Sequence, residues 1–375
     1  MDNFKLKSNL FFGRDSLCAL DDIDDANVII VCDEFIRKSG MVEKITEHLE
    51  RCTVHIFDKV VPDPPTEVIA EGINFLSECR ADYMIAVGGG SAIDAAKGMA
   101  YMAWKSGRHT IKCFYAVPTT SGTGSEVTQF SVITNAEKGM KYPLVDEALQ
   151  PHVAILDPEL VKSMPPNITA DTGMDALTHA IESYLSTKSN DFTDALAEKS
   201  VTLLMRFLPY AYAHGDDLEA REKVHNAACL AGMSFNMVGL GINHSIAHAI
   251  GAKFHIPHGR ANALLLPHVI EFNAFLESGT ETVAARKMQR LSKLIGLPYS
   301  SVPLAVSSLC SKVRDMNRLF GIPDTLAKMD ICTENVNAIR REMAEAAMAD
   351  VCTQTNPRKP ELMDIEGIIK RVTGV

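Results

Sequence analysis

Residues 83–104 read YMIAVGGGSAIDAAKGMAYMAW, and the fold class follows from this stretch. Its apolar start predicts a buried strand, the glycines 88–90 a tight turn, and the residues after Ser91 a helix. Because glycine lacks a Cβ atom, backbone N–H groups in such a turn can close on a pyrophosphate, to which the new helix presents its positive end. The spacing differs from the GxGxxG of the common dinucleotide fold, so a strand-to-helix turn without a ligand also explains the isolated motif.

A second loop of this kind follows another predicted strand. Residues 118–126 read PTTSGTGSE and combine glycines with hydroxyl groups that suit phosphate and ribose oxygens. Two such loops at neighbouring strand ends predict a bound nucleotide. Asp33 ends a further predicted strand, where a carboxylate can bind a ribose 2′-hydroxyl and would repel a 2′-phosphate, which favours NAD over NADP. An N-cap for the following helix explains Asp33 equally well.

The first part of the chain alternates predicted strands with helical patterns, as in a parallel sheet covered by helices. The predicted strands are residues 27–33, 53–58, 83–88, 113–118 and 153–157. Beyond about Pro165 strand signals nearly vanish and long helical patterns take over. We therefore predict an α/β domain with a parallel Rossmann-like sheet over residues 1–164 and an all-α domain over residues 165–375, since 375 residues exceed what one core usually supports.

Composition narrows the class of partner. The net charge is −10 and no basic cluster stands out, which argues against nucleic acid or an anionic membrane surface and favours a small-molecule ligand. The nine cysteines are scattered without a CxxC pair, and residues 1–17 do not read as a secretory signal, so we expect a cytoplasmic protein. Residues 226–252 contain no Asp, Glu, Lys or Arg, but their His, Asn and Ser side chains predict buried helices rather than a membrane span.

Two pairs of potential metal ligands are each spaced four residues apart, Asp175 with His179 and His244 with His248. Residues at this spacing share a helix face, so each pair can point at one ion. For the first pair a solvated polar face is an equally good explanation. The second pair lies in the charge-free stretch, so we expect both histidines to be buried, and buried imidazoles with a carboxylate available indicate a metal.

His258 supplies a further imidazole on a turn marked by the flanking Pro and Gly. One carboxylate and three imidazoles suit Fe²⁺ or Zn²⁺ rather than Mg²⁺ or Ca²⁺, and leave a coordination position for a substrate oxygen. Five candidates compete for four protein-ligand positions. One of His244, His248 and His258 is therefore expected to lie near the metal without binding it.

The chain resembles the iron-containing (group III) alcohol dehydrogenase family in GGGSAIDAAK, PTTSGTGSEVT, GMDALTHAIE and GLGINHSIAHAIGAKFHIPHGRANALLLPH, and on to ADVCTQTNPR near the C-terminus. The segments KGMKYPL and FTDALAEK are most similar to the 1-propanol dehydrogenases of propanediol-utilising bacterial microcompartments. The resemblance implies a dehydroquinate synthase-like architecture of an α/β nucleotide-binding domain and a helical domain with the active cleft between them. It also implies NAD and Fe²⁺, or Zn²⁺, as cofactors.

The resemblance assigns roles to individual residues. The metal ligands would be Asp175, His179, His244 and His258. His248 would be the nearby histidine that does not bind the metal, and it is our candidate for the proton relay. Contacts to the cofactor would come from Asp33, Gly88, Gly89, Gly90, Ser91, Asp94, Thr119, Thr120, Thr123 and Lys141. Asp63 stands where the family often has Asn.

The expected activity is reversible hydride transfer between NAD(H) and a short-chain aldehyde, such as propionaldehyde, or its primary alcohol, with the metal as Lewis acid. A diol dehydrogenase of the same family, acting on 1,3-propanediol or on lactaldehyde and 1,2-propanediol, is the alternative. A dehydroquinate synthase-like lyase would need several Lys and Arg for a polyanionic substrate, and the metal-bearing stretch is nearly uncharged. No motif favours a non-catalytic binding protein. The resemblance further implies a homodimer, with residues 4–13 as a candidate edge strand, and a microcompartment as a possible destination.

Overall fold

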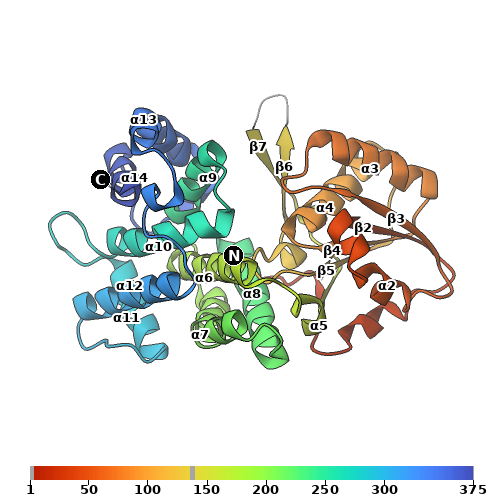
Figure 1. Ribbon diagram of the computed structural model, residues 1–375, viewed down its shortest axis with the longest axis horizontal. Coiled ribbons are helices and arrows are strands. Elements are labelled where there is room, and N and C mark those ends of the chain that lie inside the picture. The colour runs from red at the N-terminus through yellow and green to blue at the C-terminus, as the bar shows by residue number, and fades with distance from the viewer. Residues whose placement is uncertain (1–3, 136–139, 375) are drawn as a thin grey trace. The chain divides into compact units, whose positions relative to one another are not determined.

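A parallel sheet of six strands forms the centre of the first part of the chain in the computed structural model, which describes residues 4–135 and 140–374 (Figure 1). The strand order is β1-β8-β5-β4-β2-β3 and every pairing is parallel. The strands are β1 (Asn9–Phe12), β2 (Asn27–Asp33), β3 (Thr53–Val60), β4 (Tyr83–Gly88), β5 (Cys113–Pro118) and β8 (Val153–Leu156). The five strands expected from the sequence are thus confirmed. The antiparallel hairpin of β6 (Phe130–Asn135) and β7 (Met140–Val145) was not among the expectations.

Helices cover both faces of this sheet, which explains why its central strands are nearly continuous apolar runs. Alternate residues of each strand point to opposite faces, so Ile30 and Ile29 of β2 belong to two different cores. Ile45 packs in the core that contains Ile30, and Met99 in the other. The helical segments are α1 (Glu34–Lys38), α2 (Met41–Thr46), α3 (Thr66–Cys79), α4 (Gly90–Lys105) and α5 (Pro158–Val161), with short 3₁₀ turns at η1 (Ser16–Leu20), η2 (Ser125–Val127) and η3 (Glu147–Leu149).

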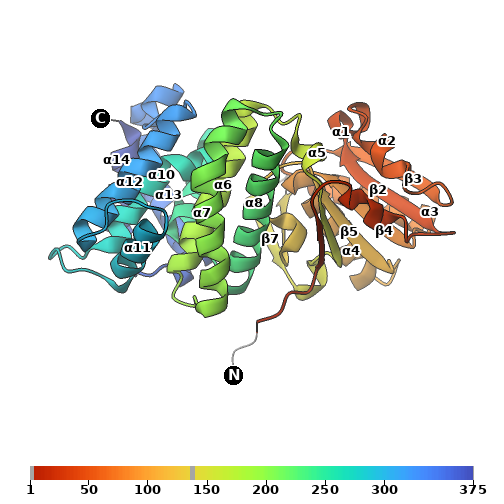
Figure 2. The same cartoon turned by 90° about the horizontal axis from the view of Figure 1, so that it is seen from below.

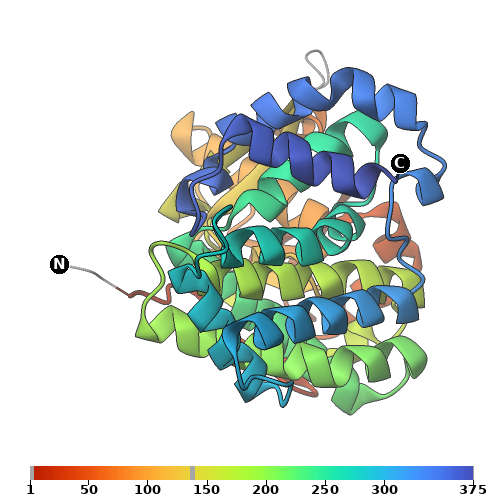
Figure 3. The same ribbon diagram turned by 90° about the vertical axis from the view of Figure 1, so that its left-hand side faces the viewer.

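The second part of the chain is helical, as Figure 3 shows. It consists of α6 (Pro166–Leu185), α7 (Asp191–Ala213), α9 (Ile242–Phe254), α10 (His258–Ala274), α11 (Val283–Leu294), α12 (Val302–Leu319), α13 (Thr333–Ala349) and α14 (Leu362–Thr373), with 3₁₀ turns at η4 (Ala327–Met329) and η5 (Val351–Thr355). Among its described residues the only β-type pairing is an isolated bridge between Phe275 and Glu281. The expected fold class, a parallel α/β region followed by a helical region, is confirmed.

One helix departs from this order along the chain. The first compact unit comprises residues up to Met164 together with Asp216–Asn236, and the second comprises Pro165–Gly215 with the residues from Met237 onward. Most of α8 (Leu218–Val238) therefore belongs to the first unit, although it follows α7 in sequence. The division into domains at residue 164 stays a prediction. Within the described part of the chain, no helix has the length and apolar character needed to cross a membrane.

Candidate metal centre and nucleotide loops

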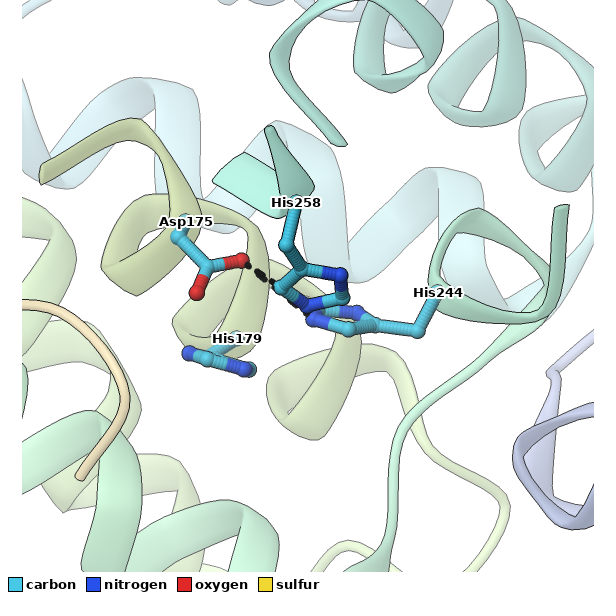
Figure 4. Close-up of side chains that lie close together, drawn as sticks. All are labelled: Asp175, His179, His244 and His258. Atoms are coloured by element: carbon cyan, nitrogen blue, oxygen red, sulfur yellow. Dashed lines mark ion pairs between the residues drawn. The ribbon is translucent and has the colours of Figure 1, made fainter. Parts of the chain in front are cut away.

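Four of the five metal-ligand candidates converge in the second unit (Figure 4). Asp175 and His179 lie one turn apart on α6, His244 lies in the first turn of α9, and His258 is the first residue of α10. Each offers one ligand atom, and these atoms all lie within 4.8 Å of one another. Oδ1 of Asp175 is 3.6 Å from Nε2 of His244 and 3.5 Å from Nε2 of His258. Three helices that start far apart in the sequence thus aim their donors at one place.

Two glycines allow these helices to approach so closely. A Cβ atom on Gly241, which precedes α9, would lie 2.8 Å from Oε1 of Glu182 on α6. The same Oε1 accepts a hydrogen bond of 2.7 Å from the backbone N–H of Asn243, so the start of α9 is fixed directly on α6. A Cβ atom on Gly259 would overlap the backbone carbonyl of Asp171. Only a residue without a side chain therefore permits α10 to place His258 beside Asp175.

Further side chains orient two of the four candidates, His244 and Asp175. The second carboxylate oxygen of Glu182 is hydrogen-bonded to Nδ1 of His244, which leaves Nε2 directed at Asp175. Asn262 donates from Nδ2 to Oδ1 of Asp175 at 2.7 Å, and its own Oδ1 accepts a hydrogen bond of 2.9 Å from Asn243. A carboxylate behind a histidine and an amide behind a carboxylate are the usual supports of metal ligands, because they fix tautomer and orientation.

The donor set fits a divalent cation of the Fe²⁺ or Zn²⁺ type. Nε2 of His244 is buried, and within the described residues it has no hydrogen-bond partner. Such an atom is costly to bury unless something else binds it, and a cation would do so. Burial by itself would raise the pKa of Asp175, but His179 and the neighbouring imidazoles outweigh it and lower the pKa below its ordinary value. Asp175 is therefore an anion at neutral pH, as a metal ligand must be.

The burial of the side chains on α6 and α9 differs from two expectations based on the sequence. The solvated-face explanation of α6 is wrong, because Asp175, His179 and Glu182 are all buried. The expectation that His244 and His248 are both buried is wrong for His248, whose side chain is 44% exposed. The charge-free stretch covers the later part of α8 and most of α9, but the second turn of α9 already reaches the surface at His248.

His248 nevertheless lies next to the cluster. Its ring stacks on that of His258, with centroids 5.2 Å apart, and meets the His244 ring edge-on at 6.0 Å. Its Nδ1 is 2.8 Å from Oδ2 of Asp350, which follows α13. His248 is not part of the group formed by the other four residues. Its hydrogen-bonded partner is a carboxylate instead.

The two candidate phosphate loops also lie together, in the first unit. They follow the paired strands β4 and β5, as expected. A Cβ atom on Gly89 would be 3.2 Å from Cγ2 of Thr120, and one on Gly90 would be 2.8 Å from Cγ2 of Thr123. Thr120 and Thr123 are partly exposed, as is Ser91 in the first turn of α4, whereas Thr119 is buried. Glycines are thus needed in the first loop to admit the threonines of the second. The hydroxyl-bearing side chains that stay partly exposed there are those of Ser91, Thr120 and Thr123.

The remaining candidates for cofactor contact have protein partners or lie outside the description. Asp33 caps α1, because its Oδ1 accepts a 2.8 Å hydrogen bond from the backbone N–H of Ile36. Asp94 accepts from the hydroxyl of Ser125 at 3.1 Å through Oδ1 and from the backbone N–H of Val132 at 3.0 Å through Oδ2. It therefore ties α4 to the second loop and to β6. The side chain of Lys141 lies outside the described residues.

Sequence reasoning missed the supporting residues. Glu182 lies seven residues after Asp175 on α6, and Asn262 lies four residues after His258 on α10, so helical spacing was an available signal for both. Asp350 is 102 residues from His248 and gave no such signal.

A parallel sheet with paired loops at its carboxyl ends, together with a buried carboxylate–imidazole cluster, defines the class of nucleotide-dependent metalloenzymes. The comparisons with known proteins specify which one. The description "Iron-containing alcohol dehydrogenase" matches residues 8–158, and "Fe-containing alcohol dehydrogenase family, C-terminal" matches residues 169–373. The chain belongs to the iron-containing alcohol dehydrogenase family. It is an oxidoreductase that interconverts alcohols and aldehydes, and the expected cofactors, Fe²⁺ and NAD, are those of this family.

Individual relatives are similar over their whole length. The chain is 42% identical over 375 residues to the 1-propanol dehydrogenase PduQ of Citrobacter freundii, covering 99% of this chain and 100% of that protein. A solved 1,3-propanediol oxidoreductase has a TM-score of 0.90 and 33% identity, with 99% of this chain and 100% of that chain covered. Sulfoacetaldehyde reductase from Bifidobacterium kashiwanohense, solved with NAD⁺, has a TM-score of 0.87 and 25% identity, with 100% of this chain and 99% of that chain covered.

Proposed function

We propose that this enzyme interconverts a short-chain aldehyde, such as propionaldehyde, and its primary alcohol, with NAD(H) and Fe²⁺. The observation that carries the proposal is the convergence of Asp175, His179, His244 and His258, with Glu182 behind His244. A divalent cation held by these four residues supplies Lewis-acid polarisation of the substrate oxygen, while NAD supplies the hydride acceptor. Zn²⁺ fits the same donor set.

His248 is our candidate for moving the proton between substrate and solvent. Its Nδ1 is bound to Asp350, so the neutral ring keeps Nε2 as the nitrogen that exchanges the proton of the alcohol. The exposed fraction of its side chain, 44%, gives water access to the ring. Asp350 holds the ring in position.

The similarities support a short, uncharged substrate. The chain is more similar to the 1-propanol dehydrogenase, at 42% identity, than to the 1,3-propanediol oxidoreductase, at 33%. Residues 226–252, which include the start of α9, carry no ionisable side chain besides histidine and cysteine, so they offer no site for an anionic substrate. The similarity to the 1,3-propanediol oxidoreductase favours a diol as the alternative substrate.

We propose that the cofactor is bound by hydroxyl side chains beside the glycine turn, by the start of α4 and by Asp33. Ser91, Thr120 and Thr123 have partly exposed side chains beside the glycine turn, and α4 begins there. Asp33 is half-buried at the end of β2, next to β4, and keeps one carboxylate oxygen free of the cap to Ile36 for a ribose.

Activity measurements test the substrate proposal. Protein purified without oxygen should contain about one iron per chain and oxidise NADH with propionaldehyde, with a higher kcat/KM than with 3-hydroxypropionaldehyde or lactaldehyde. A preference for a hydroxyaldehyde would establish the diol alternative. Absence of NADH oxidation with all three, in iron-loaded protein, would contradict the proposed function.

Two substitutions test the assigned roles. His258→Ala should lose the metal and all turnover, whereas His248→Ala should keep the metal but lose rate and change the pH profile. His268→Ala, ten residues along the same helix from His258, is the matched control and should retain both. An active, metal-replete His258→Ala variant, or an unchanged pH profile in His248→Ala, would contradict the respective role.

We further propose a homodimer and a cytoplasmic location, within a bacterial microcompartment. β1 lies within residues 4–13 and is an edge strand of the sheet, with Phe11 and Phe12 exposed. An exposed edge strand with two large apolar side chains is a suitable surface for pairing with a second copy. Cofractionation with purified microcompartment shells in the native cell tests the location.

A further inference from the structure

A single face of α8 is directed at the second candidate phosphate loop and the residues that follow it. The contacts come from His225, Cys229, Gly232 and Asn236, which recur every three or four residues as one helix face requires. Their partners all lie between Ser121 and Gln129. All these residues belong to the first compact unit.

The first contact is a hydrogen bond inside the protein. Nδ1 of His225 is 2.9 Å from the hydroxyl of Ser121, and the two residues are only 2% and 1% exposed. Burial lowers the pKa of His225 to about 4, so the ring is neutral at physiological pH. Nε2 of the same ring has no hydrogen-bond partner in the described structure. The buried ring is therefore held by one polar contact, and that contact is to the loop.

The second contact is a close approach of two backbones. A Cβ atom on Gly124 would lie 2.6 Å from Cα of Gly232, and one on Gly232 would lie 2.9 Å from Cα of Gly124. Gly124 also has a positive φ of 64°, a conformation that side chains disfavour. The loop thus lies directly on the helix, with no side chain between them.

The contacts continue to the end of the segment. The thiol of Cys229 lies beside the buried carboxyl group of Glu126, and Oδ1 of Asn236 accepts a hydrogen bond of 2.8 Å from the backbone N–H of Gln129. At the other end of the helix, Arg221 donates to the backbone carbonyl of Met164 at 2.8 Å. The helix is therefore fastened independently of the loop that it supports.

The orientation of the loop makes this support relevant to a ligand. Ser121 points into α8, whereas Thr120 and Thr123, on either side of it, stay partly exposed beside the glycine turn. Fixing Ser121 therefore fixes which way the two threonine hydroxyls face. A loop that is held in its binding conformation has less conformational entropy to lose when the ligand binds.

We propose that α8 is the positioning element for the cofactor loop, and that His225 is its principal positioning residue, acting through Ser121 on the pyrophosphate-binding conformation of residues 118–126. This inference rests on the proposed binding of NAD(H) by that loop. His225 does not touch the cofactor. Its loss should weaken cofactor binding and leave the chemical step intact once the cofactor is saturating.

Two polar substitutions separate this role from general stability. The side-chain amide of Asn reaches the place of Nδ1, whereas that of Gln reaches the place of Nε2, so His225→Asn can keep the bond to Ser121 and His225→Gln cannot. We expect the Kd for NADH, measured by fluorescence titration, to rise about tenfold in His225→Gln and to stay within about twofold of wild type in His225→Asn. The KM for NADH should follow the Kd, with kcat at saturating NADH unchanged.

A control and a double substitution complete the test. His152→Ala removes a histidine that accepts a hydrogen bond from the backbone N–H of Phe114, at the opposite end of β5 from the loop, and should leave the Kd for NADH unchanged. Ser121→Ala should raise the Kd as His225→Gln does, and the double variant should be no worse than either single one.

The outcomes distinguish a failure of the role proposed for α8 from a failure of the proposed function. Equal Kd values for His225→Asn and His225→Gln, additive effects of the Ser121 and His225 substitutions, or a loss confined to kcat would each overturn the role of α8 while NADH binding by wild type stands. Wild-type protein that binds no NADH would instead overturn the proposed function, and this inference with it.

Discussion

At the scale of single residues, the candidate metal ligands are held by side chains that are not ligand candidates themselves. Glu182 joins two helices, because one of its oxygens accepts from the backbone N–H of Asn243 and the other is bonded to Nδ1 of His244. The same carboxylate therefore fixes the start of α9 and the orientation of the ring. Asp350 has the corresponding position behind His248. His244, a candidate ligand, and His248, the candidate relay residue, are thus each held by a carboxylate from another segment.

Replacing Glu182 by Gln should weaken metal retention without removing a ligand. The amide keeps one acceptor but loses the charge and cannot satisfy both partners, so we expect metal affinity to fall about 10- to 100-fold. Metal content after dialysis against a chelator, measured by atomic absorption, reports the effect. Glu198→Gln, whose carboxylate accepts from the hydroxyl of Tyr184 on α6, is the matched control. Equal metal retention in the two variants would show that Glu182 does not orient His244.

The buried His225 should make the protein sensitive to acid. Its pKa is lowered by burial from the ordinary 6.5 to about 4, so between these values the unfolded chain binds a proton that the folded one does not. The contribution of His225 to the unfolding free energy therefore has its full value above pH 6.5. It decreases as the pH falls toward 4, by about 3 kcal/mol in total. His225→Asn lacks this titration. The urea midpoint of His225→Asn, relative to that of wild type, should therefore be higher at pH 5 than at pH 7.5. A difference between the two proteins that is the same at both pH values would contradict this prediction.

At the scale of elements, packing of helices decides what a sequence pattern means. The polar face of α6 looks like a surface face in sequence, yet it is buried because α9 and α10 begin directly upon it. Gly241 and Gly259 make these approaches possible, and Gly232 does the same for α8. Glycine inside or beside a helix is here a sign of close contact between backbones.

Gly232→Ala should therefore destabilise the protein, whereas Gly367→Ala should not. The added Cβ would meet Cα of Gly124 at 2.9 Å and Cγ2 of Val127 at 3.0 Å, so we expect a loss of about 1–3 kcal/mol in unfolding free energy and weaker NADH binding. Gly367→Ala in α14, with nothing within 4 Å of the new Cβ, should instead be neutral or stabilising by up to about 1 kcal/mol. Thermal melts and NADH titrations compare the two. Matching melting temperatures would contradict the packing argument.

At the scale of the whole molecule, segments distant in the chain complete each unit. β1 pairs with β8 in parallel, from Asn9 with Val153 to Phe12 with Leu156, so the two ends of the first 156 residues meet at one edge of the sheet. The chain also returns to the first unit once, in α8, before it forms the helices that bear His244 and His258. Neither the pairing of β1 with β8 nor the return of the chain in α8 can be predicted from local sequence periodicity.

The proposed dimer can be tested at the edge formed by β1. Phe12 is 63% exposed on this strand, and a lysine there should prevent pairing of two edges while leaving the fold intact. Wild type should sediment as a dimer and Phe12→Lys as a monomer. Phe35→Lys on α1, where the side chain is 71% exposed, is the control and should remain dimeric. A monomeric wild type, or a dimeric Phe12→Lys variant, would disprove this interface.

The sequence by itself determined the parallel α/β region, the helical region, both glycine-containing loops and the kinds of side chain in the candidate metal cluster, because these depend on local periodicity and on the chemistry of single side chains. Spacing of four residues identified Asp175 with His179 and His244 with His248, but it could not choose among three histidines. Only the tertiary structure decided that His244 and His258 share a place with Asp175 while His248 turns to Asp350. Only it placed α8 against residues 121–129. These choices depend on which helices pack together and how closely their backbones approach, and contacts between residues far apart in the chain leave no periodic signal in the sequence.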